Sequence, residues 1–99
     1  MRVFLDDERT PPDGWTLVRW PEEAIALLRT GRVEALSLDH DLGDDERGTG
    51  YDVVLWLEDQ VALHGFDPPA LRVHWANSAA RAWMEAGLAS MARLVARRG

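Results

Sequence analysis

Two short apolar runs, each ending at acidic residues, constrain the fold of this chain more than any other feature. The first run covers residues 2–5 and the second covers residues 33–38. Both are too short for an independent helix and predict strands, the second of them buried on both faces. The acidic residues that follow the two runs are Asp6, Asp7, Asp39 and Asp41. Ligands of an open parallel sheet bind beyond the carboxyl ends of its strands, so we expect these acids at one functional rim.

The rest of the chain alternates strand patterns with helix patterns. Strands are predicted over residues 2–5, 15–20, 33–38 and 71–76, and helices from Pro21 to a stop at Gly31, from Tyr51 to about His64, and from a cap at Asn77 or Ser78 onward. The run 15–20 alternates and carries charge, which favours a position near a sheet edge. This order predicts an α/β protein with a parallel sheet of about four strands, in a single domain over residues 1–99.

Composition narrows the possible functions. The 99 residues include no Cys, so a bound metal would need oxygen or imidazole ligands, which favours a hard cation. All eleven basic residues are Arg, which excludes a mechanism that needs a lysine amine. The net charge of −6 argues against binding a long nucleic-acid tract but leaves room for a phosphorylated end. No apolar run approaches the roughly 20 residues of a membrane span, and we expect a soluble, cytoplasmic protein.

The four aspartates form the candidate metal site. Carboxylates packed closely raise one another's pKa unless a cation lies among them. Mg²⁺, or Mn²⁺ in its place, suits an open rim because Mg²⁺ binds through one or two carboxylates together with waters and phosphate oxygens. The alternative is that Asp6, Asp7, Asp39 and Asp41 are solvated loop residues that cap the segments after them.

Other polar residues near the predicted rim have both a functional and an ordinary interpretation. His40 and His74 could act as general acid and base, or could be structural rings that orient an aspartate. Arg9 could fork onto a phosphate, or pair with a rim carboxylate. Asn77 and Ser78 open the last helix, where backbone N–H groups can bind an anion, although both are also common caps. Among the aromatic residues, the candidates for a partner surface are Trp20, Trp75 and Trp83.

These residues resemble those of a known family. The acidic pair after the first strand, the aspartate that ends the third strand and the helices after strands two to four resemble the receiver domain of two-component signalling. Four ordered motifs resemble, more specifically, the small bacterial and phage proteins called cyclic-phosphate processing receiver domains. The motifs are Leu5 to Pro11, Ser37 to Gly43, Gly50 to Val53 with Trp56 and Leu57, and His74 to Asn77.

The resemblance implies a receiver-like (flavodoxin-like) fold that lacks the first helix and the fifth strand of ordinary receivers. It also implies action on cyclic phosphate ends of RNA or nucleotides, with an acidic centre at Asp6, Asp7, Asp39 and Asp41. The other polar positions that it carries over are Arg9, His40 and His74. Two departures matter: Trp75 follows His74 where the family pattern has Ser, and the chain lacks the lysine that contacts the phosphoryl group in ordinary receivers.

We therefore expect a metal-dependent phosphoesterase that acts on a cyclic-phosphate nucleotide or RNA end. In this hypothesis His74 protonates the leaving oxygen or activates water, and Arg9 offsets charge on the phosphate. His40 is the second candidate for proton transfer, and Asn77 and Ser78 are candidates for substrate binding. One alternative is a degenerate receiver that signals through Asp39 as phosphoacceptor. The other is an interaction module whose acidic rim mimics an anionic ligand.

Overall fold

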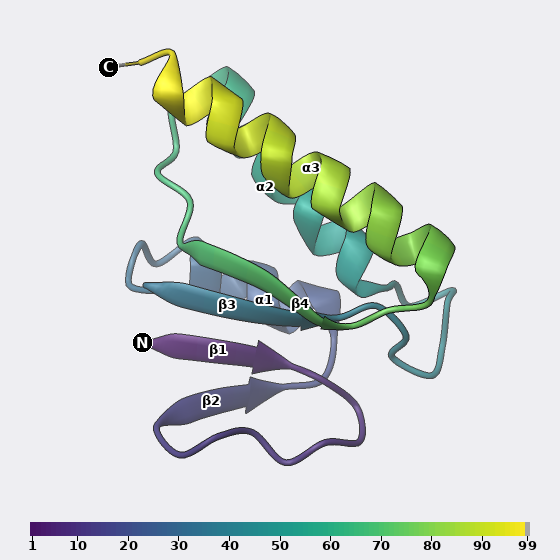
Figure 1. Ribbon diagram of the computed structural model, residues 1–99. Helices are drawn as coiled ribbons and strands as arrows, with labels where there is room; N and C mark the ends of the chain where they lie inside the picture. Colours follow the sequence, from purple (N-terminus) through teal and green to yellow (C-terminus); the bar gives the residue numbers. More distant parts are fainter. Residues whose placement is uncertain (99) are drawn as a thin grey trace.

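A computed structural model describes residues 1–98 of the chain. Its strands are β1 (Arg2–Leu5), β2 (Trp15–Val18), β3 (Ala35–Asp39) and β4 (Ala70–Trp75), and its helices are α1 (Pro21–Leu28), α2 (Gly50–His64) and α3 (Ser78–Ala96) (Figure 1). Every predicted element is present; β1 has its predicted bounds, and most other elements have shifted ends. The second strand stops at Val18 because Trp20 is the N-cap of α1, where the Glu23 carboxylate accepts the Trp20 backbone N–H at 3.1 Å.

The four strands form one sheet in the order β2-β1-β3-β4, with all neighbours parallel. This confirms the predicted α/β architecture and the edge position of β2. In the central pair, Arg2 is level with Ala35 and Leu5 is level with Leu38. The two central strands therefore end together, and the residues that follow them meet at one edge of the sheet.

All three helices lie over the same face of the sheet. The crossovers β2-α1-β3 and β3-α2-β4 both advance across the sheet in the same direction, and right-handed crossovers of this kind place their helices on one side. Helix α3 follows β4 and packs against α2. The β1–β2 connection advances in the opposite direction, and it is a loop. Within residues 1–98, the second face therefore carries no covering helix (Figure 1).

The core lies between the sheet and the helices. Alternate strand residues point into it, including Val3, Leu5, Leu36 and Leu38, and all four are fully buried. Helix α2 contributes four buried apolar residues: Val53, Val54, Leu57 and Val61. From α3, Met84 and Met91 close the core. No helix in the described part of the chain combines the length and apolar character needed to cross a membrane.

Candidate functional site

The candidate site lies at the carboxyl ends of the two central strands. Asp6 directly follows β1 and is fully buried, and Asp39 ends β3 with 2% of its surface exposed. Beside them opens a cavity of about 150 Å³. The residues that line the cavity are Asp7, Glu8, Arg9, Asp39, Asp41 and Trp75. The structure thus brings all four predicted aspartates to one edge of the sheet.

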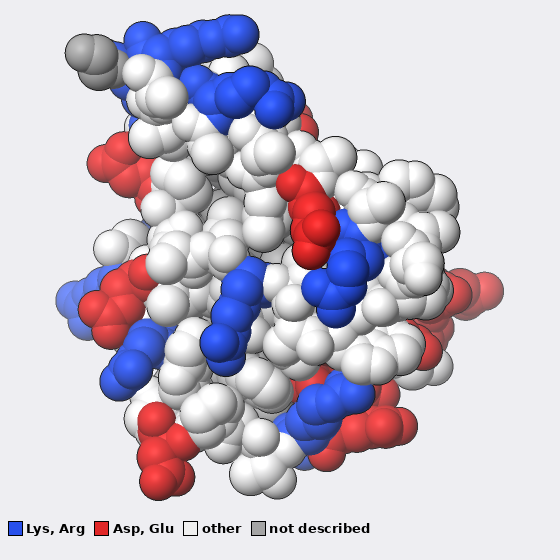
Figure 2. Space-filling view, in the orientation of Figure 1, with Lys and Arg blue, Asp and Glu red and all other residues white. Residues whose placement is uncertain are grey.

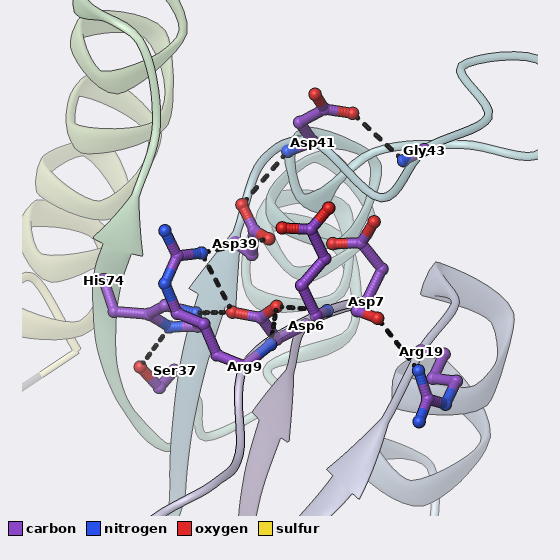
Figure 3. Close-up of polar contacts among 10 residues, drawn as sticks. Asp6, Asp7, Arg9, Arg19, Ser37, Asp39, Asp41, Gly43 and His74 are labelled. Atoms are coloured by element: carbon purple, nitrogen blue, oxygen red, sulfur yellow. Dashed lines mark hydrogen bonds and ion pairs between the residues drawn. The ribbon is translucent and has the colours of Figure 1, made fainter.

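Asp6 is held by hydrogen bonds on both carboxylate oxygens (Figure 3). Its Oδ1 accepts the backbone N–H groups of Glu8 at 2.8 Å and Arg9 at 2.9 Å. Its Oδ2 lies 2.8 Å from Nε2 of His74 and 3.3 Å from a terminal nitrogen of Arg9. Burial raises the pKa of Asp6, but these hydrogen bonds outweigh burial and hold the pKa at about 2. Asp6 is therefore a fixed anion at neutral pH.

Asp39 has fewer partners, although it is almost as buried. One of its oxygens accepts the backbone N–H of Asp41 at 3.2 Å, and the other lies 3.7 Å from the Arg9 guanidinium. Burial, together with the negative charges of Asp6 and Asp7, raises the pKa of Asp39 to about 7. The raised pKa shows that nearby positive charge does not compensate for the burial of this carboxyl group and for the negative charges beside it.

His74 lies within a chain of hydrogen bonds that runs from Arg72 through Ser37 to Asp6. Its Nδ1 is 2.7 Å from the Ser37 hydroxyl, and that hydroxyl accepts the Nε–H of Arg72 at 3.1 Å. Because the Asp6 carboxylate only accepts, Nε2 of His74 must carry a proton, and Ser37 then donates to Nδ1. Burial lowers the pKa of His74, despite the opposing influence of Asp6. The ring is thus the neutral Nε2–H tautomer.

A shift in strand register aims the His74 ring at Asp6. Leu38 pairs with Val73, but the next residue of β3, Asp39, pairs with Trp75, so His74 is the extra residue of a bulge. Such bulges re-aim side chains next to functional sites. The ring also stacks on Phe4, with centroids 4.2 Å apart and planes 9° apart. These contacts fix both the position and the plane of the imidazole.

The remaining predicted site residues lie at differing distances from this centre. Asp7 and Asp41 line the cavity at its mouth. His40 uses its backbone to join β3 to β4 and α2, and His40 is absent from the cavity-lining residues within the described chain. Asn77 caps α3 by accepting the N–H of Ala80 at 2.9 Å, and Ser78 is the exposed first residue of that helix.

The residues around Asp6 and Asp39 fit a divalent cation. One ligand atom each from Asp6, Asp39 and His74 lies within 4.8 Å of the other two. The Arg9 guanidinium now lies beside both carboxylates and 5.7 Å from the ring centre of Trp75. Its side chain is 46% exposed. One arginine beside two buried carboxylates leaves an excess of negative charge, which is typical of sites for hard cations.

Sequence reasoning did not single out Ser37, Arg72 or Glu8. Ser37 stands alone as a hydroxyl between two leucines of a buried strand, and such a residue needs a hydrogen-bond partner. That signal was available, but it does not reveal that the partner is His74. Arg72 and Glu8 resemble ordinary surface residues in the sequence, so only their positions in the structure connect them to the site.

Comparison with known proteins identifies one family. The family model described as "Cyclic-phosphate processing Receiver domain" matches residues 1–90 of the 99-residue chain. Searches among curated proteins and among solved structures found no match. The matched range contains all four strands, the helices α1 and α2, and every residue that lines the cavity.

Proposed function

The chain belongs to the cyclic-phosphate processing receiver domain family, and from this premise we propose that its cavity hydrolyses cyclic phosphate ends of RNA or of nucleotides. One observation carries the proposal beyond the family description. Asp6 and Asp39, two buried carboxylates, meet beside a cavity that also presents an arginine. This combination suits a phosphate group that is held together with a cation.

In this proposal Asp6 and Asp39 would hold Mg²⁺ or Mn²⁺ beside the cavity that Asp7 and Asp41 help to line. When bound, the cation would act as a Lewis acid toward a phosphoryl oxygen. Arg9 leaves the two carboxylates and forks onto the phosphate, where its planar group can make two parallel hydrogen bonds. Arg9 thus pairs with the two carboxylates in the free protein, and it pairs with the phosphate once the phosphate is bound.

The contacts of His74 favour an orienting role over proton transfer. Its Nε2–H already points at Asp6, and its Nδ1 accepts from Ser37. We therefore assign proton transfer to Glu8, whose exposed carboxylate lines the cavity. Glu8 takes a proton from the attacking water as the new bond from oxygen to phosphorus forms. It returns that proton to the 2′ or 3′ oxygen that leaves as the ring opens.

Turnover of nucleoside 2′,3′-cyclic phosphates tests this function. Phosphorus NMR should show a cyclic ester converted to a monoester by wild-type protein with Mg²⁺ or Mn²⁺. Asp39→Asn should lose cation binding and activity together, whereas Asp67→Asn serves as a control because Asp67 is 96% exposed and pairs with Arg98 away from the cavity. Wild-type protein that is inert toward a panel of cyclic-phosphate nucleotides and RNA ends would contradict the proposal.

Two variants separate the proposed roles of Glu8 and His74. Loss of a general base typically costs about 10² to 10⁴ in rate, so Glu8→Gln should lower kcat within that range and leave cation affinity unchanged. His74→Ala should instead weaken cation affinity by about 10 to 100-fold, as removal of an orienting partner does. If His74→Ala lowers kcat at saturating cation while Glu8→Gln does not, proton transfer belongs to the imidazole.

A further inference from the structure

The face of the sheet opposite the helices carries an organised set of side chains. Parallel sheets are almost always covered on both faces, yet within residues 1–98 this face is not covered by any helix (Figure 1). Figure 2, in the same orientation, shows arginine side chains among uncharged residues, with acidic side chains beside several of them. The strand residues that point this way include Phe4 of β1, Trp15 of β2, Arg72 of β4 and His74 of β4.

A row of aromatic rings crosses this face and begins at the candidate site; Phe4, in its middle, is only 5% exposed, and Trp15, at its far end, is half-buried. The Nε2 atom of His74 is hydrogen-bonded to Asp6 Oδ2 at 2.8 Å. The His74 ring stacks on Phe4, with the two ring centres 4.2 Å apart. Phe4 in turn meets Trp15 edge to face, with ring centres 6.4 Å apart. The row therefore connects the acidic cavity at the carboxyl ends of the strands with the amino-terminal end of β2.

The far end of the row has a second cavity and two arginines. This cavity, of about 140 Å³, is lined by Trp15, Ala35, Leu36, Ala70, Leu71 and Arg72. The guanidinium carbons of Arg2 and Arg72 lie 5.8 Å and 5.3 Å from the Trp15 ring centre. The acidic partner that Arg2 has here is Glu34, at 3.8 Å and well exposed. A flat apolar slot beside two cations suits a ligand that is both aromatic and anionic.

We infer that this helix-free face binds the nucleotides upstream of the cyclic phosphate, so that the substrate is the end of a short single-stranded RNA. The inference rests on the proposed function. Trp15 is the ring of the row that lines a cavity, and an accessible aromatic side chain beside arginines is the usual means of binding single-stranded nucleic acid without reading its sequence. From Asp39 to Ala35 the sheet spans roughly 13 Å, which is the length of about four stacked nucleotides. Such a short contact agrees with the acidic net charge of the whole chain.

The dependence of affinity on RNA length tests the inference without any turnover. The probes are uridine 3′-phosphate and a 3′-phosphorylated uridine tetranucleotide, both of which lack a ring to open, measured by calorimetry with Mg²⁺ present. Wild-type protein should bind the tetranucleotide at least about tenfold more tightly than the mononucleotide. Trp15→Leu should remove about tenfold of that gain, since base stacking has this size. Arg2→Gln, an exposed change that spares the fold, should lower the salt dependence by about 0.7 in logarithmic slope.

The chain offers matched controls on its helical side. The guanidinium carbon of Arg29 lies 5.8 Å from the ring centre of Trp56. This is the same kind of arginine–tryptophan contact as at Trp15, on the other side of the sheet. Trp56→Leu and Arg29→Gln should keep the full length dependence, and Trp15→Leu should keep wild-type turnover of a mononucleotide cyclic phosphate.

Equal affinity for the two probes would overturn the inference while leaving the proposed function intact. So would sedimentation showing a dimer that Trp15→Leu dissociates, because a second copy would then cover this face. If wild-type protein does not turn over a mononucleotide cyclic phosphate, the proposed function itself is refuted.

Discussion

At the scale of single residues, Asp39 should dominate the pH dependence of stability when no cation is bound. Its pKa rises from 3.8 to about 7 on folding, so between these values the folded protein binds more protons than the unfolded chain. The free energy of unfolding should therefore fall as the pH rises from about 4 to about 7 in EDTA, by an amount on the order of 4 kcal/mol. Urea denaturation at a series of pH values measures this fall.

Two further observations complete that test. Asp39→Asn should remove most of the decline, because the amide does not titrate. Asp6 acts in the opposite sense, since its pKa falls to about 2 on folding, and its stabilising contribution is lost only as the pH drops below about 4. A stability profile of the metal-free protein that rises from about pH 4 to 7 would contradict the buried, poorly compensated position of Asp39.

Ser37 should matter for stability although it is a small residue remote from the solvent. Ser37→Ala removes the partner of both Arg72 Nε and His74 Nδ1, and it leaves the buried imidazole nitrogen unpaired. An unsatisfied buried group of this kind costs about 1 to 3 kcal/mol in the free energy of unfolding. Chemical denaturation should show that loss, while Ser78→Ala, at an exposed helix start, should cost far less. Equal effects of the two changes would mean that the hydrogen-bond chain contributes little.

At the scale of elements, the close approach of α2 to β3 determines where Asp39 sits. Gly50 begins α2, donates its N–H to the His40 carbonyl at 3.1 Å, and leaves no space for a Cβ against the Asp39 carbonyl oxygen. Gly50→Ala must push α2 away from the end of β3, so both the melting temperature and the cation affinity should fall, the latter by at least about tenfold.

Gly31→Ala is the matched control for that change. Gly31 has a φ of +74°, and a Cβ added there would meet no atom within 4 Å, so alanine costs about 1 to 2 kcal/mol through its backbone alone. The control should lose stability and keep its cation affinity. If calorimetry finds unchanged cation affinity in Gly50→Ala as well, the spacing between α2 and β3 does not control the site.

The elements were predictable to different degrees. Strand and helix patterns along the chain predicted four strands and three helices, and the acids after two of the strands predicted the meeting of Asp6 with Asp39. The order of the strands and the register shift beside His74 depend on pairing across the sheet, which hydrophobic periodicity along one strand does not contain. Consequently the direction of the His74 ring, the role of Ser37 and the uncovered sheet face emerge only from the structure.

At the scale of the whole molecule, a bound cation should stabilise the fold. A ligand that binds only the folded state at a hundred times its Kd adds about 2.7 kcal/mol. For a chain of this size that corresponds to a rise in melting temperature of roughly 10 to 20 °C. Calorimetric scans with Mg²⁺ or Mn²⁺ should show the rise in wild-type protein and not in Asp39→Asn. A wild-type melting temperature indifferent to both cations would remove the metal from the proposal.

The central position of β1 has a consequence for the order of folding. This strand is synthesised before the other three, yet one of its two neighbours, β3, begins 33 residues later in the register of Arg2 with Ala35. The apolar side chains of Val3 and Leu5 therefore cannot pack beside β3 until β3 has been synthesised, and pairing over such a sequence separation is slow. The pairing of β1 with β3 also brings Asp6 and Asp39 together. The two aspartates repel each other at that moment, so the carboxylates of the candidate site also slow the step that joins the two central strands.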